Sequence, residues 1–154
     1  MAQNLHQILI HVVFHKRTHA ATIRPNDQPL LNKCIVNICH NLQCPCLIAN
    51  GIGDHEHLLF VLSPQRTVSE VIKEVKRMST HYLKYHDKEY YKHFNWQAGY
   101  GAFGVSVKLR EVVFDYIAHQ QEHHKRMDMR VELAALLQSA QIKNYEETLY
   151  WEKE

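Results

Sequence analysis

The chain has 154 residues, of which 18 are lysine or arginine and 16 are aspartate or glutamate, so the formal net charge is only +2. The length suits one domain over residues 1–154, and the hydrophobic share of 45% is ordinary for a globular protein. No apolar run is long enough to span a bilayer, and residues 1–6 lack the layout of a signal peptide. We therefore expect a cytoplasmic protein with no membrane partner, whose affinity for any nucleic acid comes from local clusters of charge.

The first third of the chain predicts a strand, a helix and two further strands. Residues 7–14 are apolar and β-branched, which indicates a strand. Pro29 suits the start of a helix, and apolar residues recur at helical spacing over residues 30–42. Two more strands are predicted over residues 46–50 and 56–62, separated by a turn that contains two glycines.

A capping-box pattern at Thr67 predicts the start of a helix over residues 68–86. A glycine-rich segment then leads into a short strand over residues 103–107, followed by helices over 108–124 and 130–140. The order β-α-β-β-α-β-α-α opens with the split βαβ pattern of ferredoxin-like folds. We therefore expect an α+β fold with an antiparallel sheet and two helices on one face, which leaves an open face that could receive either the later helix with Tyr116 or a ligand.

Two histidines are predicted to project side by side from the third strand. His55 and His57 follow the turn at Gly53, and residues i and i+2 of a strand point to the same face. Two such imidazoles could bind one metal ion, with Asp54 orienting one ring as an outer partner. A His-X-His triplet is also frequent by chance, and two histidines that merely pack are the alternative.

Tyr116 and Gln120 are predicted to share a face of the helix over residues 108–124, since they are four positions apart. A tyrosine beside a metal ion could act as a covalent nucleophile. Its ordinary pKa is about 10, so a nearby base or a metal-bound hydroxide would have to assist its deprotonation. The amide oxygen of Gln120 could reach the same ion. The alternatives are a tyrosine that only packs and a glutamine that faces solvent.

Basic residues gather in two places that could contact DNA phosphates. Lys16 and Arg17 follow the first strand, and Lys73, Lys76 and Arg77 lie along the helix over residues 68–86. Lysines that contact DNA give binding a strong salt dependence. The alternative for the helical residues is a solvated surface.

Four cysteines, Cys34, Cys39, Cys44 and Cys46, lie within a short stretch. Their spacing does not match the paired two-residue gaps of common zinc modules. We expect buried, reduced thiols that pack as small hydrophobic side chains.

Three passages in order resemble the single-tyrosine HUH transposases of small bacterial insertion sequences and their kin associated with repetitive extragenic palindromes. The first is Asp54-His55-Glu56-His57-Leu58-Leu59, which is similar to the family's Asp-His-X-His strand. The second runs from Trp96 to Ser106 and resembles its Trp-Gln-X-Gly-Tyr-Gly-Ala-Phe segment. The third runs from Tyr116 to His124 and resembles its Tyr-Ile-X-X-Gln-X-X-His-His helix. The resemblance covers essentially the whole chain.

The resemblance implies a DNA transposase that cleaves and rejoins single-stranded DNA at insertion-sequence ends through a 5′-phosphotyrosine. It implies that Tyr116 attacks the scissile phosphate, and that His55, His57 and Gln120 hold Mg²⁺ or Mn²⁺. The implied partners are DNA with hairpin ends and a second copy of the chain, with no small-molecule substrate. In the implied homodimer, the histidine pair of one subunit meets the tyrosine helix of the other.

One residue departs from the family pattern, because Glu56 stands where the triplet has a hydrophobic residue. We expect its side chain to point away from the histidines and to remain wet at the rim of the strand, since an unpaired buried charge is costly. Glu56 favours one alternative, a non-catalytic hairpin-DNA-binding descendant. A metal-dependent hydrolase that uses water, with Tyr116 as a bystander, and an interaction domain are the others.

Overall fold

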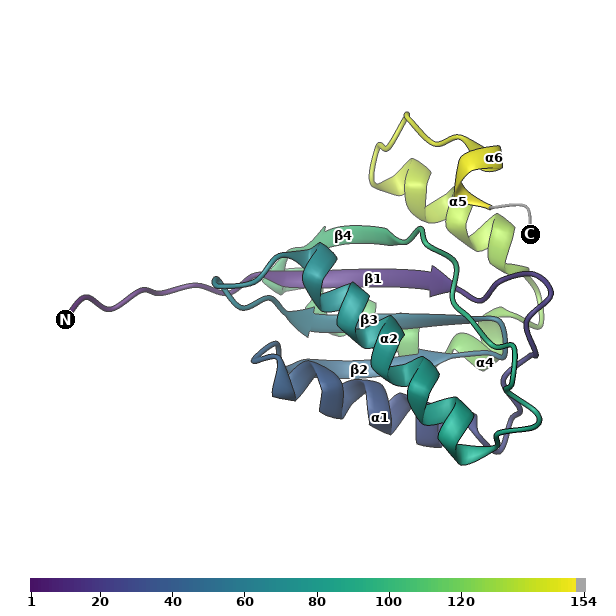
Figure 1. Ribbon diagram of the computed structural model, residues 1–154. Helices are drawn as coiled ribbons and strands as arrows, with labels where there is room; N and C mark the ends of the chain where they lie inside the picture. Colours follow the sequence, from purple (N-terminus) through teal and green to yellow (C-terminus); the bar gives the residue numbers. More distant parts are fainter. Residues whose placement is uncertain (152–154) are drawn as a thin grey trace.

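A four-stranded antiparallel sheet forms the centre of the molecule, a computed structural model that describes residues 1–151 (Figure 1). Its strands are β1 (Leu9–His15), β2 (Cys46–Gly51), β3 (His55–Val61) and β4 (Gly101–Val105). Their order across the sheet is β2-β3-β1-β4, which is the order of a ferredoxin-like fold. The predicted α+β class is confirmed, and the last three residues of the predicted domain lie outside the described part.

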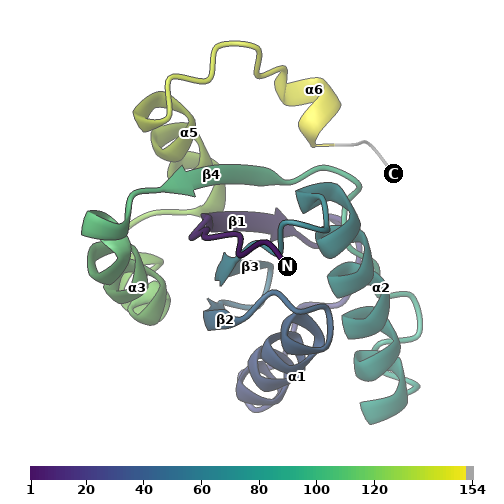
Figure 2. The same ribbon diagram turned by 90° about the vertical axis from the view of Figure 1, so that its left-hand side faces the viewer.

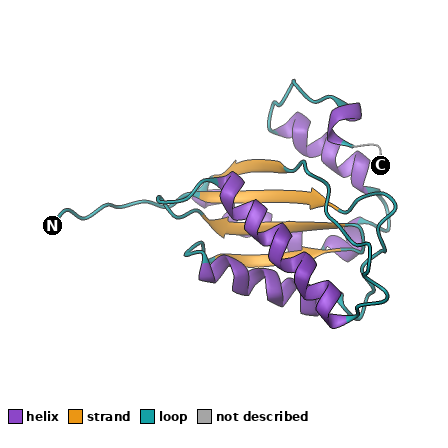
Figure 3. Ribbon diagram, viewed as in Figure 1, coloured by secondary structure: helices purple, strands orange, loops and turns teal. Residues whose placement is uncertain are grey.

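Helices lie on both faces of this sheet (Figure 2). The two long helices α1 and α2 cover one face, as the element order predicted, and α3 and α5 lie on the other side of the sheet (Figures 2 and 3). The helical elements are α1 (Gln28–Asn41), α2 (Val68–His86), the 3-10 turn η1 (Val107–Leu109), α3 (Arg110–Ala118), α4 (Gln120–His123), α5 (Met129–Ser139) and α6 (Glu147–Tyr150).

The two faces of the sheet follow from the alternation of side chains along each strand. On β1 and β3, Val12, Phe14, Leu58 and Phe60 are fully buried against α1 and α2 in the main core. The intervening positions point to the opposite face and carry a row of histidines. Two smaller apolar clusters, one around Ile117 of α3 and one around Leu133 and Leu137 of α5, hold the later helices on that face.

Two helices begin at side-chain caps, the first of them at the residue predicted from the sequence. Thr67 accepts a hydrogen bond from the Glu70 N–H at the start of α2, and Asp128 caps α5 by accepting from two backbone N–H groups. The last strand begins two residues earlier than predicted, because Gly101 pairs with Val13 of β1. A Cβ at Gly101 would lie 3.2 Å from Val13 Cγ1, so glycine suits this close pairing.

The helix predicted over residues 108–124 is divided at His119, which ends α3 and precedes α4. At this break the carbonyl oxygens of Ile117 and Ala118 turn toward the Asn50 side chain of β2, at 2.9 and 3.4 Å. A tertiary contact thus takes the place of helix continuation.

Two further findings concern the cysteines and the helices. The four cysteines are free thiols; Cys39, Cys44 and Cys46 are buried, as predicted, whereas Cys34 is only half-buried. Among the described residues, none of the helices combines the length and the apolar character that crossing a membrane requires.

Candidate metal and tyrosine site

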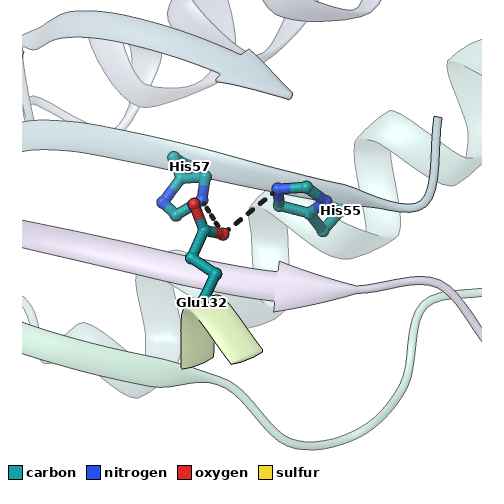
Figure 4. Close-up of side chains that lie close together, drawn as sticks. All are labelled: His55, His57 and Glu132. Carbon is teal, nitrogen blue, oxygen red and sulfur yellow. Dashed lines mark hydrogen bonds and ion pairs between the residues drawn. The ribbon is translucent and has the colours of Figure 1, made fainter. Parts of the chain in front are cut away.

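The two histidines of β3 form the centre of the site. His55 and His57 are fully buried, and their ring centroids lie 5.1 Å apart on one face of the strand, as predicted. Both rings turn toward the carboxylate of Glu132, which enters from α5 (Figure 4). Glu132 Oε1 lies 2.9 Å from Nε2 of His57 and 3.4 Å from Nε2 of His55.

The Nδ1 atom of each ring, which faces away from Glu132, contacts a polar side chain that orients the ring. Asp54 Oδ1 lies 2.6 Å from Nδ1 of His55, so this carboxylate contacts the ring that it was expected to orient. Nδ1 of His57 lies 2.8 Å from Nε2 of His11 on the neighbouring strand. Both imidazoles therefore present Nε2 to the same point, an arrangement that outer partners commonly impose on metal-binding histidines.

Burial and hydrogen bonding shift the pKa values of His55, His57 and Glu132 in different directions. Burial lowers the pKa of His57 to about 4, so its imidazole is neutral at pH 7. Burial opposes the charge on His55 as well, but hydrogen bonds to Asp54 and Glu132 raise its pKa to about 10. Although burial disfavours the Glu132 anion, hydrogen bonds from His124, His55 and His57 hold its pKa well below its usual range. The site is thus built around one buried carboxylate that attracts positive charge.

The donor set fits a divalent cation. One nitrogen from each histidine and one oxygen of Glu132 lie within 4.8 Å of one another, and all three residues are buried. Two imidazoles and a carboxylate oxygen are ligands that Mn²⁺ and Zn²⁺ accept readily, and Mg²⁺ takes them with added water.

Glu132 was not predicted from the sequence. An acidic residue in the first turn of a helix usually signals a favourable interaction with the helix dipole, so nothing in the local pattern distinguishes it. The neighbouring Leu133 packs in a hydrophobic cluster, so the buried side of α5 carries both an apolar residue and the carboxylate of Glu132.

Gln120 lies beside the histidine pair, although the helix is interrupted at His119 between it and Tyr116. Its side chain is fully buried, and Oε1 lies 3.1 Å from Nε2 of His55 and 3.1 Å from Nε2 of His124. The structure therefore brings this amide oxygen to the histidine pair, and metal binding by Gln120 stays a prediction.

Tyr116 meets the histidine pair of its own chain. Its ring centroid lies 5.8 Å from that of His57 and 4.8 Å from that of His123, against which it stacks. Its hydroxyl donates a short hydrogen bond to Glu132 Oε2. Burial, together with the bond to this anionic partner, raises the pKa of Tyr116, so the phenol holds its proton. The implied arrangement with a tyrosine from a second subunit is not needed to complete this site.

Two further histidines on β1 were missed. His11 and His15 point to the same face of the sheet as the pair on β3, and the ring of His15 stacks 5.7 Å from that of His55. Burial lowers the pKa of His11 to about 3 and that of His15 well below its usual value. Their separation by four positions on a strand was the signal, because it places both on one face.

Glu56 is not wet, and this expectation is wrong. Its side chain is fully buried on the α1 face, where Gln28 Nε2 donates a short hydrogen bond to it. Burial raises the pKa of Glu56 to about 8, so the carboxyl is neutral at pH 7. With its amide oriented so that each atom faces a partner, Asn32 donates from Nδ2 to Glu56 Oε1 at 3.0 Å. No unpaired charge is buried, and Glu56 faces away from the histidine pair.

The predicted DNA-binding residues fall in two places. Lys73, Lys76 and Arg77 of α2 line a cavity of about 530 Å³, on the opposite face of the sheet from the histidines. Lys16 lines a second cavity of about 520 Å³ together with Asp54, and its backbone N–H donates to the Asp54 carbonyl at 2.9 Å. Arg17 follows directly, so Lys16 and Arg17 are the predicted basic residues nearest the site.

Lys76 has an additional structural contact. Its ammonium donates hydrogen bonds to the carbonyls of Gln97, Ala98 and Gly99, at 2.6 to 3.1 Å. It therefore holds the loop that precedes β4, while its charge still lines the cavity. Arg77 pairs with Glu74 at 2.7 Å, and Lys73 is exposed.

Comparison with known proteins connects this arrangement to a family. The family model described as "Transposase IS200 like" matches residues 4–120, about three quarters of the chain, and includes both histidines and Tyr116. The match ends before α5, so Glu132 lies beyond it. A search of curated proteins found no match.

Two solved structures share the fold. A candidate transposase from Deinococcus radiodurans R1 is 16% identical with a TM-score of 0.62, over 78% of this chain and 95% of that one. A REP-associated tyrosine transposase bound to a REP hairpin is 15% identical with a TM-score of 0.58, over 80% of this chain and 74% of that one.

Proposed function

The chain belongs to the IS200-like transposase family, and from this premise we propose that it cleaves and rejoins single-stranded DNA through a phosphotyrosine on Tyr116. The observation that carries the proposal is the hydrogen bond from Tyr116 to Glu132, the same carboxylate that lies against His55 and His57. A candidate nucleophile and a candidate metal site therefore share one side chain.

The proposed ligands of a divalent cation, Mg²⁺ or Mn²⁺, are His55, His57 and the oxygens of Gln120 and Glu132. When bound, such an ion supplies a Lewis acid that polarises a phosphate oxygen and stabilises developing charge. His57 is neutral at pH 7, and its Nε2 can bind an ion when the ring proton is on Nδ1, where Nε2 of His11 can accept it. His11 and Asp54 keep the two rings in place.

The proposed reaction is a transesterification in which atoms and bonds balance. The Tyr116 oxygen forms a bond to phosphorus, the bond from phosphorus to the 3′ oxygen breaks, and the phenol proton leaves through its hydrogen bond to Glu132 Oε2. The proton then goes to the departing oxygen, which gives a free 3′-OH and a 5′-phosphotyrosine. Attack of a 3′-OH on the phosphotyrosine reverses these steps, so rejoining needs no external energy.

The proposed substrate is single-stranded DNA with hairpin ends. The structural neighbour bound to a REP hairpin supports this choice, and so do the two basic regions. We assign Lys73, Lys76 and Arg77 to one phosphate-contacting surface, and Lys16 and Arg17 to another beside the site. A homodimer is also proposed, since the exposed apolar side chains of α3, including Val112 and Phe114, offer a surface for a second copy.

Two alternative functions, a non-catalytic DNA-binding protein and a hydrolase that uses water, are weakened by the positions of Glu56 and Tyr116. The non-catalytic alternative relied on Glu56, which is neutral and turned away from the metal face. The hydrolase alternative treats Tyr116 as a bystander, whereas its hydroxyl contacts Glu132 at the centre of the site.

The test uses single-stranded DNA that carries the palindromes flanking the gene, incubated with Mg²⁺ or Mn²⁺ and run on a denaturing gel. Wild-type protein should form a covalent adduct, and Tyr116→Phe should form none. Tyr85→Phe, at an exposed position, is the matched control. Undiminished adduct from Tyr116→Phe would refute the nucleophile. Cleavage without adduct supports the hydrolase, and binding without cleavage supports the non-catalytic alternative.

A further inference from the structure

The cavity of about 520 Å³ beside the candidate metal site shares one residue with that site. Asp54 lines the cavity, and its Oδ1 lies 2.6 Å from Nδ1 of His55. The other walls come from the loop after β1, the turn between β2 and β3, and the starts of α1, α4 and α5. Figure 1 shows the loop after β1 and the turn between β2 and β3 at the same end of the sheet. The cavity is therefore next to the proposed reaction centre.

The lining of this cavity combines apolar side chains with a few polar ones. Ile23, Pro25, Ile52 and Met129 are the apolar residues of the lining. A cavity of this volume with such a lining is typical of a site for a small organic group. A nucleobase has two flat apolar faces and a polar edge, and enzymes that read single bases hold them between apolar side chains in this way. The lining thus suits one base of a DNA strand.

The walls of the cavity are fixed to one another by hydrogen bonds. The Ile23 N–H donates to the Gly53 carbonyl at 2.8 Å, and the Lys16 N–H donates to the Asp54 carbonyl at 2.9 Å. From α1, the buried Gln28 accepts a hydrogen bond from the Gly53 N–H at 3.2 Å. Gly53 has a φ of 58°, which favours glycine in this turn. Because the walls are already in place, a base that enters loses little affinity to ordering of the protein.

Two polar groups of the lining have hydrogen-bonding capacity to spare. Asp54 Oδ1 faces His55, whereas Oδ2 accepts no hydrogen bond from the described residues 1–151, and the side chain is 39% exposed. Lys16 Nζ donates to the carbonyls of Arg17 and Thr18, each at 3.2 Å. An ammonium has three N–H donors, so Lys16 can still contact a phosphate. The cavity therefore offers an acceptor for a base and a cation for the backbone of the same strand.

We propose that this cavity binds one unpaired nucleobase of the substrate strand, adjacent to the scissile phosphate. Lys16 contacts the adjoining phosphate, and Asp54 Oδ2 accepts a hydrogen bond from the exocyclic amino group of the base. Adenine, cytosine and guanine carry such an amino group, whereas thymine does not, so the site should disfavour thymine. A paired base is stacked inside a duplex and cannot enter, which restricts the site to single-stranded DNA. This base site rests on the proposed function for the position of the scissile phosphate.

The first test measures DNA binding without cleavage. Tyr116→Phe protein is titrated with the single-stranded DNA of the adduct assay, and fluorescence anisotropy gives the Kd. An abasic site then replaces each nucleotide around the scissile bond in turn, or along the whole strand if no adduct marks that bond. One abasic position should weaken binding by about 10-fold, because burial of an apolar group of similar size contributes at least that much.

Variants of the lining show whether that base lies in this cavity. Thr18→Trp and Thr22→Trp should fill it, and both positions are exposed, so the fold should tolerate them. Ile52→Ala removes part of the apolar wall. Each change, combined with Tyr116→Phe, should weaken binding of intact DNA by about 10-fold and should abolish the further loss at the abasic position. Thr148→Trp is the matched control at an exposed position outside the lining. An undiminished abasic effect in all three variants would overturn the base site.

The second test uses free nucleotides and needs neither cleavage nor a chosen DNA sequence. In ¹⁵N-labelled protein, the amide resonances of Gly51 and Gly53 should move on titration with dAMP, dCMP or dGMP. With dTMP, the same shifts should need about 10-fold more nucleotide, since the hydrogen bond to a carboxylate is lost. Thr22→Trp should abolish the shifts, and Thr148→Trp should leave them unchanged. Equal shifts with dTMP would refute the role of Asp54.

The two tests separate the base site from the proposed function. If wild-type protein forms no adduct while the nucleotides move both glycine resonances, the role of Tyr116 fails and the base site stands. If adduct forms, but no abasic effect depends on the lining and no nucleotide moves these resonances, the base site fails and the role of Tyr116 stands.

Discussion

Tyr116 donates its hydroxyl hydrogen bond to Glu132, a residue 16 positions later on a different helix. Through its other oxygen, the same carboxylate lies 2.9 Å from Nε2 of His57. One side chain of α5 thus joins the tyrosine helix to the histidines of the sheet. Glu132 is therefore the residue whose removal should alter both halves of the site.

Glu132→Gln should weaken Mn²⁺ binding by more than about 10-fold, because it removes the negative charge from the proposed ligand set. Measurement of free Mn²⁺ by electron paramagnetic resonance during titration gives the affinity. Glu122→Gln changes an exposed glutamate of α4 and should bind as wild type does. Equal affinities for Glu132→Gln and wild type would exclude Glu132 as a ligand.

His11→Phe should lower Mn²⁺ affinity by about 10- to 100-fold without contacting the ion, since His11 orients His57 through Nδ1. The aromatic replacement keeps most of the buried volume, so circular dichroism should show an intact fold. His81→Phe, at an exposed position on α2, serves as the control. An unchanged affinity in His11→Phe would mean that the ring of His57 needs no outer partner.

Lys73→Ala and Arg77→Ala should weaken DNA binding, and each should reduce the slope of log affinity against log salt concentration by about 0.7 for a single strand. Fluorescence anisotropy across a range of NaCl concentrations measures both. Lys92→Ala, at an exposed position away from the cavity, is the control. A slope that stays at the wild-type value would remove α2 from the DNA-binding surface.

Lys76→Ala should behave differently from its two neighbours on α2. Its ammonium bonds three carbonyls before β4, so the variant should also lower Tm, whereas Lys73→Ala should leave Tm unchanged. Differential scanning fluorimetry makes the comparison. Equal Tm values for the two variants would contradict the structural role of Lys76.

Glu56→Gln should gain stability relative to wild type as pH rises. The pKa of Glu56 is about 8 in the folded chain and about 4.5 when exposed, so between these values the folded state holds a proton that the unfolded state lacks. The contribution of Glu56 is therefore full below about pH 4.5 and is lost as pH approaches 8. The difference in unfolding free energy should change by at most about 1.4 kcal/mol per pH unit.

Urea unfolding of both proteins at pH 5, 6, 7 and 8, with a chelator present, measures this difference. Glu89→Gln, at an exposed position, provides the comparison and should show no trend. A difference between Glu56→Gln and wild type that stays constant with pH would show that the buried carboxyl is ionised throughout.

Much of the architecture follows from local pattern. The alternation of side chains along strands placed His55 and His57 on one face, and the cap at Thr67 began α2 at the predicted residue. The order of elements was sufficient to predict the sheet and the two helices on one of its faces. These features depend on residues that are near in sequence, where steric and hydrogen-bonding rules act directly.

The tertiary structure alone decided which distant residues share the site. Glu132 and Asn50 carry no distinguishing local signal, because their partners lie on other elements and meet them only when the layers pack. For the same reason the helix break at His119 and the burial of Glu56 were not predicted: each is set by a hydrogen bond to another element. The sequence by itself determined the two pairs of candidate catalytic groups, and packing determined the carboxylate that joins them.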